Sequence, residues 1–223
     1  MKQWHIENSQ LFEDVKKSVK THFPTLHVVM ENEVVFIRGA LHLPEGIDYY
    51  SIEVELLADY PESVPLVREI GGRIARNGDR HIYTNGTCCL FVAEETWKFY
   101  PKGTTIVDFI EKVVTAHFIN QTHFELTGKW LWGERSHGLN GILEFYKEEL
   151  KTDDLVLIYK FIEYLAKVNV KKYWLCYCGS KKKFQHCHFR QLLDYRQKIK
   201  PEIAKNSLLL FNYELEKYRQ LDK

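Results

Sequence analysis

The chain reads Tyr50-Ser-Ile-Glu-Val-Glu-Leu-Leu-Ala-Asp-Tyr60-Pro61-Glu-Ser-Val-Pro65 within its first third. Polar and apolar residues alternate from Ser51 to Leu56, and this alternation predicts a β-strand with one buried and one solvated face. Pro61 and Pro65 end the strand, because proline cannot donate a hydrogen bond to a neighbouring strand. Further β-rich runs lie on both sides of it, at residues 25–30, 34–43 and 66–70. The stretch therefore belongs to a predicted β-sheet.

Helical patterns surround the predicted sheet. Leu11, Val15 and Val19 recur at helical spacing and predict an opening helix. Thr104 and Thr105 cap a second helix, and further helices are predicted at residues 137–150, 153–168 and 190–218. Residues 78–103 are irregular and polar but contain Trp, Phe, Tyr and Cys, so we expect an ordered, functional loop there. We expect an α+β fold with a first domain at residues 1–150 and a second at 151–223.

Composition limits the class of protein. A chain of 223 residues with 45% hydrophobic and 27% charged residues suits one large domain, or one domain with an appendage. No run approaches the length of a membrane span, and the start has no apolar signal region. Cysteines spaced for metal rather than for disulfides indicate a reducing compartment. We therefore expect a cytoplasmic protein with no membrane partner.

The net charge of +1 conceals an uneven distribution. Residues Lys171 to Lys200 hold nine Lys/Arg and one acid, Asp194, which gives this segment a charge of +8 and the rest of the chain −7. One interpretation is a solvated basic face. The other is a docking surface for an acidic partner or for nucleic acid.

Three of the five cysteines lie in one short segment, Cys176-Tyr-Cys178-Gly-Ser-Lys-Lys-Lys-Phe-Gln-His-Cys187-His188. Two thiols, a Gly-Ser turn and a Cys-His pair form a compact ligand set of the tetrahedral zinc type. His186 is a rival for the fourth ligand. A site with four protein ligands and no open position is structural rather than catalytic.

The other two cysteines are adjacent, in Asp79-Arg-His81-Ile-Tyr83-Thr-Asn85-Gly86-Thr-Cys88-Cys89-Leu90. A thiol eight residues after a histidine, in a glycine-containing loop, fits a cysteine nucleophile activated by a base. Cys and His at this spacing fit equally well with two small core thiols and a surface histidine. The residues alone leave both interpretations open.

Two stretches of the chain resemble the ubiquitin-conjugating-enzyme superfamily, in particular its bacterial members. They are the strand with its Tyr60-Pro61 turn and the loop Ile82-Tyr83-Thr-Asn85-Gly86-Thr-Cys88-Cys89-Leu90. A downstream segment, Trp130-Leu-Trp-Gly-Glu-Arg-Ser-His-Gly, adds to the likeness, which covers roughly residues 8–150. The resemblance implies an antiparallel sheet with flanking helices. The family's His-Pro-Asn element is replaced by Asp79-Arg80-His81.

This resemblance implies acyl transfer through a thioester on Cys89. An activating enzyme acting in trans supplies the C-terminus of a protein modifier or of a nucleotidyltransferase, unless activation is bypassed, and a protein target receives it. The bacterial members that the chain resembles often belong to antiphage systems, so the resemblance implies this context. His81 then replaces the family's asparagine as an oxyanion donor, or acts as a base. Tyr83 and Asn85 support the loop or serve only as turn residues, and Asp79 either orients His81 or is a turn acid. Cys88 points into the core or acts as a resolving thiol.

The cysteine-rich segment is similar to the SEC-C module, a zinc-binding tail. Carried over position by position, the resemblance implies a structural Zn2+ held by Cys176, Cys178, Cys187 and His188. Gly179 and Ser180 would form the turn whose N–H groups bond the thiolates.

Two other classes of function remain open. One is a non-catalytic protein-binding module on the same fold, with zinc-dependent docking. The other is a nucleic-acid adaptor, which rests on the basic segment alone.

Overall fold

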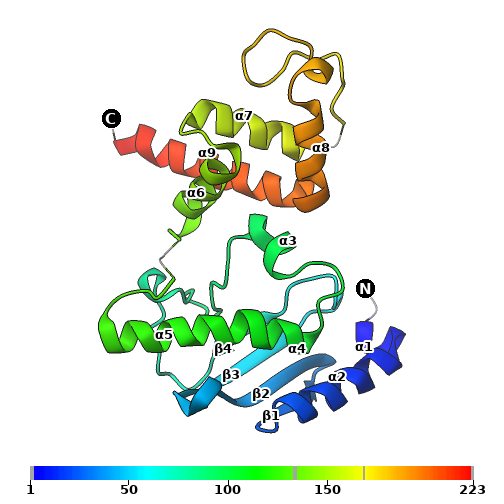
Figure 1. The fold of residues 1–223 in the computed structure, drawn as a ribbon, viewed down its shortest axis with the longest axis vertical. Helices are drawn as coiled ribbons and strands as arrows, with labels where there is room; N and C mark the ends of the chain where they lie inside the picture. Colours follow the sequence, from blue (N-terminus) through cyan, green and yellow to red (C-terminus); the bar gives the residue numbers. More distant parts are fainter. Residues whose placement is uncertain (1–2, 133–134, 168, 222–223) are drawn as a thin grey trace. The chain divides into compact units, whose positions relative to one another are not determined.

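A computed structural model describes residues 3–132, 135–167 and 169–221. The chain forms two compact units. Residues 1–91 and 98–134 make up the first, here called the sheet unit, and residues 92–97 and 135–223 make up the second, the helical unit. Figure 1 shows the strands in the first unit and the α-helices from α6 onward in the second. Val168, the predicted end of one helix, and Gly133 and Glu134 lie outside the described residues.

The sheet unit is built on a four-stranded antiparallel meander in the order β1-β2-β3-β4. Its strands are β1 (Leu26–Glu31), β2 (Val34–His42), β3 (Tyr49–Leu56) and β4 (Leu66–Glu69). Asn32 and Glu33 both have positive φ, which is the backbone of a tight two-residue hairpin turn. Burial alternates along β3, as the sequence pattern predicts. The expected α+β fold class is confirmed, and the arrangement is consistent with a ubiquitin-conjugating-like fold.

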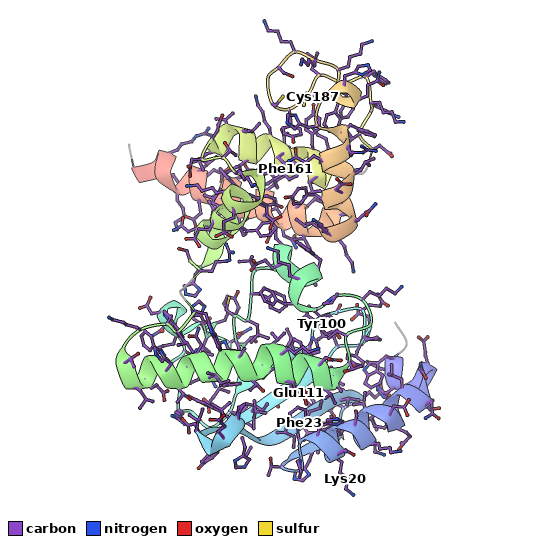
Figure 2. The ribbon with its side chains drawn as sticks, viewed as in Figure 1. Lys20, Phe23, Tyr100, Glu111, Phe161 and Cys187 are labelled. Atoms are coloured by element: carbon purple, nitrogen blue, oxygen red, sulfur yellow. The ribbon has the colours of Figure 1, made fainter. Side chains whose placement is uncertain are left out.

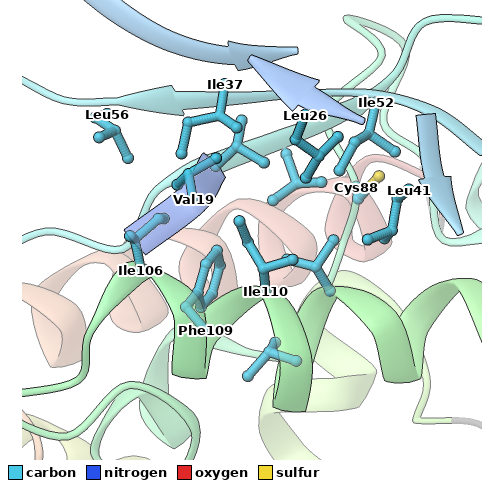
Figure 3. Close-up of a cluster of buried hydrophobic side chains, with 14 of the residues drawn as sticks. Val19, Leu26, Ile37, Leu41, Ile52, Leu56, Cys88, Ile106, Phe109 and Ile110 are labelled. Atoms are coloured by element: carbon cyan, nitrogen blue, oxygen red, sulfur yellow. The ribbon is translucent and has the colours of Figure 1, made fainter. Parts of the chain in front are cut away.

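Helices pack on the buried face of this sheet. They are α1 (Trp4–Glu7), α2 (Ser9–His22), α4 (Ile106–Phe109), a π-helical segment (Ile110–Val114) and α5 (Thr115–Thr127). On α2, Val15 and Val19 are buried, whereas Lys20 points to solvent (Figure 2). Figure 3 shows Ile37 and Ile52 of the sheet meeting Phe109 and Ile110 of the helix. This cluster is the core of the sheet unit.

The helical segment from α4 to α5 has two polar contacts that fit its local geometry. Thr105 caps α4 by accepting a hydrogen bond from the amide of Asp108, as the sequence predicts. At the end of the π-helical segment, the hydroxyl of Thr115 donates to the carbonyl of Ile110, at 2.8 Å. The helix thereby carries its inner side chains across the sheet.

The helical unit has its own apolar core. It contains η3 (Ala93–Glu95), α6 (Gly138–Leu150), α7 (Leu155–Ala166), η5 (Phe184–His186), α8 (Phe189–Lys198) and α9 (Pro201–Leu221), and α3 (Thr96–Phe99) begins in it. Phe145, Tyr146, Phe161 and Phe184 are fully buried in this core. Figure 2 labels Phe161 among the helices and Cys187 in the outer loop. The domain boundary at residue 150 stays a prediction. Helix α6 belongs to the helical unit, because its residues Phe145 and Tyr146 are buried in the core of that unit.

The prediction of a single helix at residues 190–218 is wrong, because the structure has two helices there. The amide of Ile199 closes α8 on the carbonyl of Tyr195, and α9 starts at Pro201. Proline lacks an amide hydrogen and disfavours helical geometry in the residue before it, so it begins a helix and cannot continue one. No helix in the described part of the chain is long and apolar enough to cross a membrane.

Candidate active site and candidate metal centre

A short hairpin holds the residues of the candidate active site. The amide of Cys89 donates to the carbonyl of His81 at 2.7 Å, and the amide of Tyr83 donates to the carbonyl of Thr87 at 2.9 Å. Between these two bonds, Ile82 and Cys88 form an antiparallel bridge. Successive residues of an extended chain face opposite sides, and alternate residues share a side. His81, Tyr83 and Cys89 therefore share one face of the hairpin.

The other face belongs to the core. Ile82 and Cys88 are 3% and 5% exposed, and the amide of Cys88 donates to the carbonyl of Val67 at 2.7 Å. Figure 3 shows Cys88 among the core side chains. Burial raises the pKa of the Cys88 thiol to about 12, so this group is a neutral thiol at physiological pH. Cys88 is therefore a packing residue by position and by charge.

The turn of the hairpin needs its particular residues. Gly86 has φ +85°, and a side chain there would meet the guanidinium carbon of Arg76 at 3.2 Å. The Asn85 side chain accepts a hydrogen bond from the amide of Thr87 at 3.0 Å. Asn85 and Gly86 thus shape the turn, and Asn85 does so through its side chain. Asp79 lies on η2 (Gly78–Arg80), where it is exposed.

The sulfur of Cys89 is half-buried between a hydroxyl and an imidazole. The Tyr83 hydroxyl donates to Cys89 Sγ at 3.4 Å. One ring nitrogen of His81 lies within 4.8 Å of the same sulfur. Burial raises the pKa of the Cys89 thiol, and the hydrogen bond from Tyr83 opposes that rise. A thiol so placed has both a donor for its thiolate form and a nearby group that can accept a proton.

His81 itself has an unusual backbone. It ends η2 in the left-handed region, with φ 51° and ψ 33°. The Asn77 side chain caps the same turn by accepting from the amide of Arg80 at 3.0 Å. The imidazole meets the ring of Trp130 edge-on, with centroids 4.8 Å apart. Backbone and side chain are therefore both constrained.

A buried network fixes Arg80, the residue before His81. Gln121 of α5 has no exposed surface, and its side-chain nitrogen donates to the carbonyl of Arg80 at 2.7 Å. Its oxygen accepts from the Arg80 guanidinium at 3.0 and 3.1 Å. Glu125, one turn further along α5, pairs with the same guanidinium at 3.0 Å. Gln121 lies 41 residues from Arg80 and was not among the predicted site residues. Its signal in the sequence is a polar residue in line with Val114 and Phe118 on the inner stripe of a helix.

The candidate metal centre lies in the helical unit. The sulfurs of Cys176, Cys178 and Cys187 and a ring nitrogen of His188 all lie within 4.8 Å of one another. The sulfurs of Cys178 and Cys187 are 3.6 Å apart, and Nδ1 of His188 is 3.1 Å from Cys187 Sγ and 3.2 Å from Cys176 Sγ. A tetrahedral ion with Zn–S bonds of about 2.3 Å places two sulfurs about 3.8 Å apart. The donor set therefore fits zinc.

Neighbouring groups support the thiolate of Cys178. Burial raises the pKa of Cys178, but hydrogen bonds from the hydroxyl and the amide of Ser180 outweigh it, and the pKa falls to about 6. Gly179 supplies the positive φ of the turn, +74°. His186 is exposed, with its Nε2 at 2.9 Å from the side-chain nitrogen Nε2 of Gln185 rather than among the thiols. The segment is closed by a bridge between Leu175 and Lys183.

An antiparallel sheet covered by helices on one face, with a half-buried cysteine on a hairpin beside it, defines a protein of the ubiquitin-conjugating (E2) class. The chain belongs to the family of type II CBASS E2 proteins, whose family model matches residues 15–138, more than half of the chain. This family consists of E2-like proteins of bacterial antiphage defence, which work with other CBASS proteins. The matched region contains the whole hairpin and ends before the candidate metal centre. Searches of curated proteins and of solved structures found no match.

Proposed function

We propose that this protein carries the C-terminal acyl group of another protein as a thioester on Cys89 and transfers it to an amine during antiphage defence. The observation that carries the proposal is the environment of the two thiols. Cys88 is buried in the core, whereas the Cys89 sulfur is half-buried beside a hydroxyl donor and an imidazole. The family's thioester position and the more accessible thiol are the same residue.

The chemistry has two steps. In loading, the Cys89 thiolate attacks an activated acyl carbon, a C–S bond forms, and the activating group leaves with its electron pair. In transfer, an amine attacks the thioester carbonyl, the tetrahedral oxyanion collapses, and the C–S electron pair returns to sulfur. His81 is within reach to accept the proton that the amine loses, or to donate a hydrogen bond to the oxyanion.

The partners follow from this chemistry and from the family. The acyl donor is a protein C-terminus, of a ubiquitin-like modifier or of a nucleotidyltransferase in the same CBASS system. An activating enzyme in trans forms the reactive acyl group, and a protein amine is the acceptor. These identities rest on the proposed thioester.

We also propose that the segment Cys176–His188, which resembles the SEC-C module, binds one structural Zn2+. Cys176, Cys178, Cys187 and His188 would hold the ion through three sulfurs and Nδ1. When bound, zinc supplies cross-linking of the segment rather than chemistry at a substrate. Cys176 is 5% exposed and belongs to the core of the helical unit, so the cross-link would stabilise that core as well.

The surface around this segment is suited to docking. Its six cations are exposed, and none of them forms an ion pair with any described residue: Lys171, Lys172, Lys181, Lys182, Lys183 and Arg190. Uncompensated like charges repel one another, and an acidic partner relieves that repulsion. We assign docking of an acidic protein surface to these cations.

A trapping experiment tests the thioester. The chain is expressed with the other proteins of its defence system, and adducts are separated with and without dithiothreitol. The wild-type adduct should disappear with dithiothreitol, whereas Cys89→Ser should hold an oxyester that resists it. Cys88→Ser, the matched control, should behave as the wild type. If neither the wild type nor Cys89→Ser forms an adduct, the fold serves as a non-catalytic binding module.

A further inference from the structure

The hydroxyl of Tyr83 is aimed at the sulfur of Cys89. As a whole residue Tyr83 is 55% exposed, yet its hydroxyl donates to Cys89 Sγ at 3.4 Å. Among the described residues, Cys89 is the hydrogen-bond partner of this hydroxyl. Among these residues, the hydroxyl is therefore directed at the sulfur rather than at another polar group.

The backbone holds this pair in place. The Tyr83 amide donates to Thr87 and its carbonyl accepts from Gly86, at 2.9 and 2.8 Å. The Cys89 amide is bonded to His81 on the opposite strand. Both members of the pair are thus fixed in one hairpin, and no movement of another element is needed to bring them together.

We propose that Tyr83 is a catalytic residue whose hydroxyl stabilises the Cys89 sulfur as the leaving group during acyl transfer. This inference rests on the proposed thioester. The sulfur of a thioester carries little charge, and the sulfur that leaves is a thiolate. A hydrogen bond to an ionised acceptor is about twice as strong as one to a neutral acceptor. The bond from Tyr83 therefore strengthens as the C–S bond breaks, which is the condition for catalysis.

The electrons and protons balance without proton transfer from the tyrosine. The amine nitrogen bonds to the carbonyl carbon and loses its proton to a base, the C–S bond breaks, and the electron pair goes to Sγ. Burial, and then the hydrogen bond to Cys89, raise the pKa of Tyr83 above its ordinary value. The hydroxyl thus stays protonated, and it donates a hydrogen bond throughout the step.

Acyl transfer develops negative charge at two atoms, and each atom requires its own stabilising group. The oxyanion forms on the acyl oxygen, and the thiolate forms on the sulfur. Because Tyr83 contacts the sulfur, it serves the second, and His81 remains available for the first or for the proton of the amine. The missing His-Pro-Asn asparagine is not replaced by Tyr83.

Two measurements on the full chain test the proposal, with Tyr83→Phe removing only the hydroxyl. Tyr49→Phe is the control, because Tyr49 is 57% exposed on β3 and has no contact with Cys89. In the first, iodoacetamide labelling of Cys89 is followed by mass spectrometry from pH 6 to pH 10. His81, Cys88 and Tyr83 are the titratable groups of the sheet unit beside this sulfur, and the first two are unchanged in every variant.

Loss of a donor to the thiolate should move the labelling midpoint of Tyr83→Phe to higher pH. Labelling should slow about 3- to 10-fold at pH 7, because the lost hydrogen bond stabilised the thiolate, although the S···O contact is long. At high pH the rate should equal or exceed that of the wild type, because a thiolate released from a hydrogen bond is the stronger nucleophile. A loosened loop would instead change the rate in one direction at every pH. Superimposable profiles overturn the proposal.

In the second measurement, Cys89 is loaded by exchange with a short peptide α-thioester, and release of the peptide to free lysine is timed. Tyr83→Phe should slow this release about 10- to 100-fold, and Tyr49→Phe should leave it unchanged. If the wild type loads and Tyr83→Phe releases at the wild-type rate, the role of Tyr83 fails and the thioester stands. If the wild type does not load at all, both fail.

Discussion

The backbone amide of Cys89 donates a 2.7 Å hydrogen bond to the carbonyl oxygen of His81. This bond makes the two residues neighbours on adjacent strands of one hairpin, so their side chains face the same side. The sulfur and a ring nitrogen lie within 4.8 Å as a result. Backbone pairing thus places the thiol and the imidazole side by side on one face of the hairpin.

The two adjacent thiols should respond oppositely to truncation. Cys89→Ala should abolish adduct formation and leave the melting temperature unchanged within error, because its side chain is only half-buried. Cys88→Ala should keep adduct formation and lose about 1 kcal/mol of unfolding free energy, because its sulfur fills space in the core. Thermal unfolding and adduct formation are measured on the same preparations. If Cys88→Ala loses adducts at normal stability, Cys88 is the nucleophile.

Gln121 should stabilise the site through its hydrogen bonds to Arg80, the residue before His81. Gln121→Leu leaves the Arg80 carbonyl and guanidinium without their buried partner, which should cost about 1–3 kcal/mol of unfolding free energy. The left-handed turn at His81 should loosen. As a result, iodoacetamide should no longer label Cys89 faster than it labels Cys88. Gln10→Leu is the control, because Gln10 is exposed on α2 and its side chain bonds only Asp14 among the residues that the structure describes. Equal stability of both variants would remove Gln121 from the account of the site.

Gly39 should tolerate no side chain. Its φ is +145°, and a Cβ there would lie 2.0 Å from the carbonyl oxygen of Thr25. Gly39→Ala should therefore cost more than about 2 kcal/mol, because backbone strain and a backbone clash combine. Gly46→Ala also has positive φ but meets open space, so it should cost about 1 kcal/mol. Urea unfolding of both variants checks the order, and the reverse order would contradict the register of β1 and β2.

Stability should fall in acid as Asp48 is protonated. The hydrogen bond from Arg73 lowers the pKa of Asp48 to about 2, against an ordinary value of 3.8. A depressed carboxyl pKa stabilises the folded state above the unfolded-state pKa, and this contribution is lost as pH falls toward 2. Asp48→Asn should thus be less stable than the wild type at pH 7, and the gap should narrow below pH 4. Urea midpoints from pH 7 to pH 3 measure it, and a gap independent of pH would refute the pairing.

One zinc ion per chain should be found by elemental analysis. His188→Gln should lose it, and His186→Gln, the matched control, should keep it, because only His188 places a ring nitrogen among the thiols. Chelation should expose the amides near residues 172–199 to hydrogen exchange and leave the sheet unit protected, because each unit has its own core. Retention of zinc by His188→Gln would contradict the proposed ligand set.

The strands were predictable because their signal is local. Alternation along β3 and the prolines after it are visible in the sequence, and the observed strand ends lie within two residues of the predicted ones. The capping of α4 by Thr105 was predictable for the same reason. The break between α8 and α9 also has a local signal, Pro201. The prediction missed this signal because helical apolar spacing continues on both sides of the proline.

The site was predictable only in part. The resemblance of the loop to the ubiquitin-conjugating family identifies Cys89, Tyr83 and Asn85 as candidates, because the motif is contiguous in the sequence. The sequence does not say that the Tyr83 hydroxyl reaches the sulfur, since that depends on the turn at Gly86 and the pairing of Ile82 with Cys88. The support from α5 depends on a contact across 41 residues, for which local patterns carry no information.

The most direct test of the central claim is intact-mass analysis of the wild-type chain purified under non-reducing conditions with its defence partners. The account predicts a covalent adduct of a protein C-terminus that hydroxylamine removes, and peptide mapping that assigns it to Cys89. An adduct on Cys88 or on a lysine, or a chain that remains unmodified while its defence system is active, would contradict it.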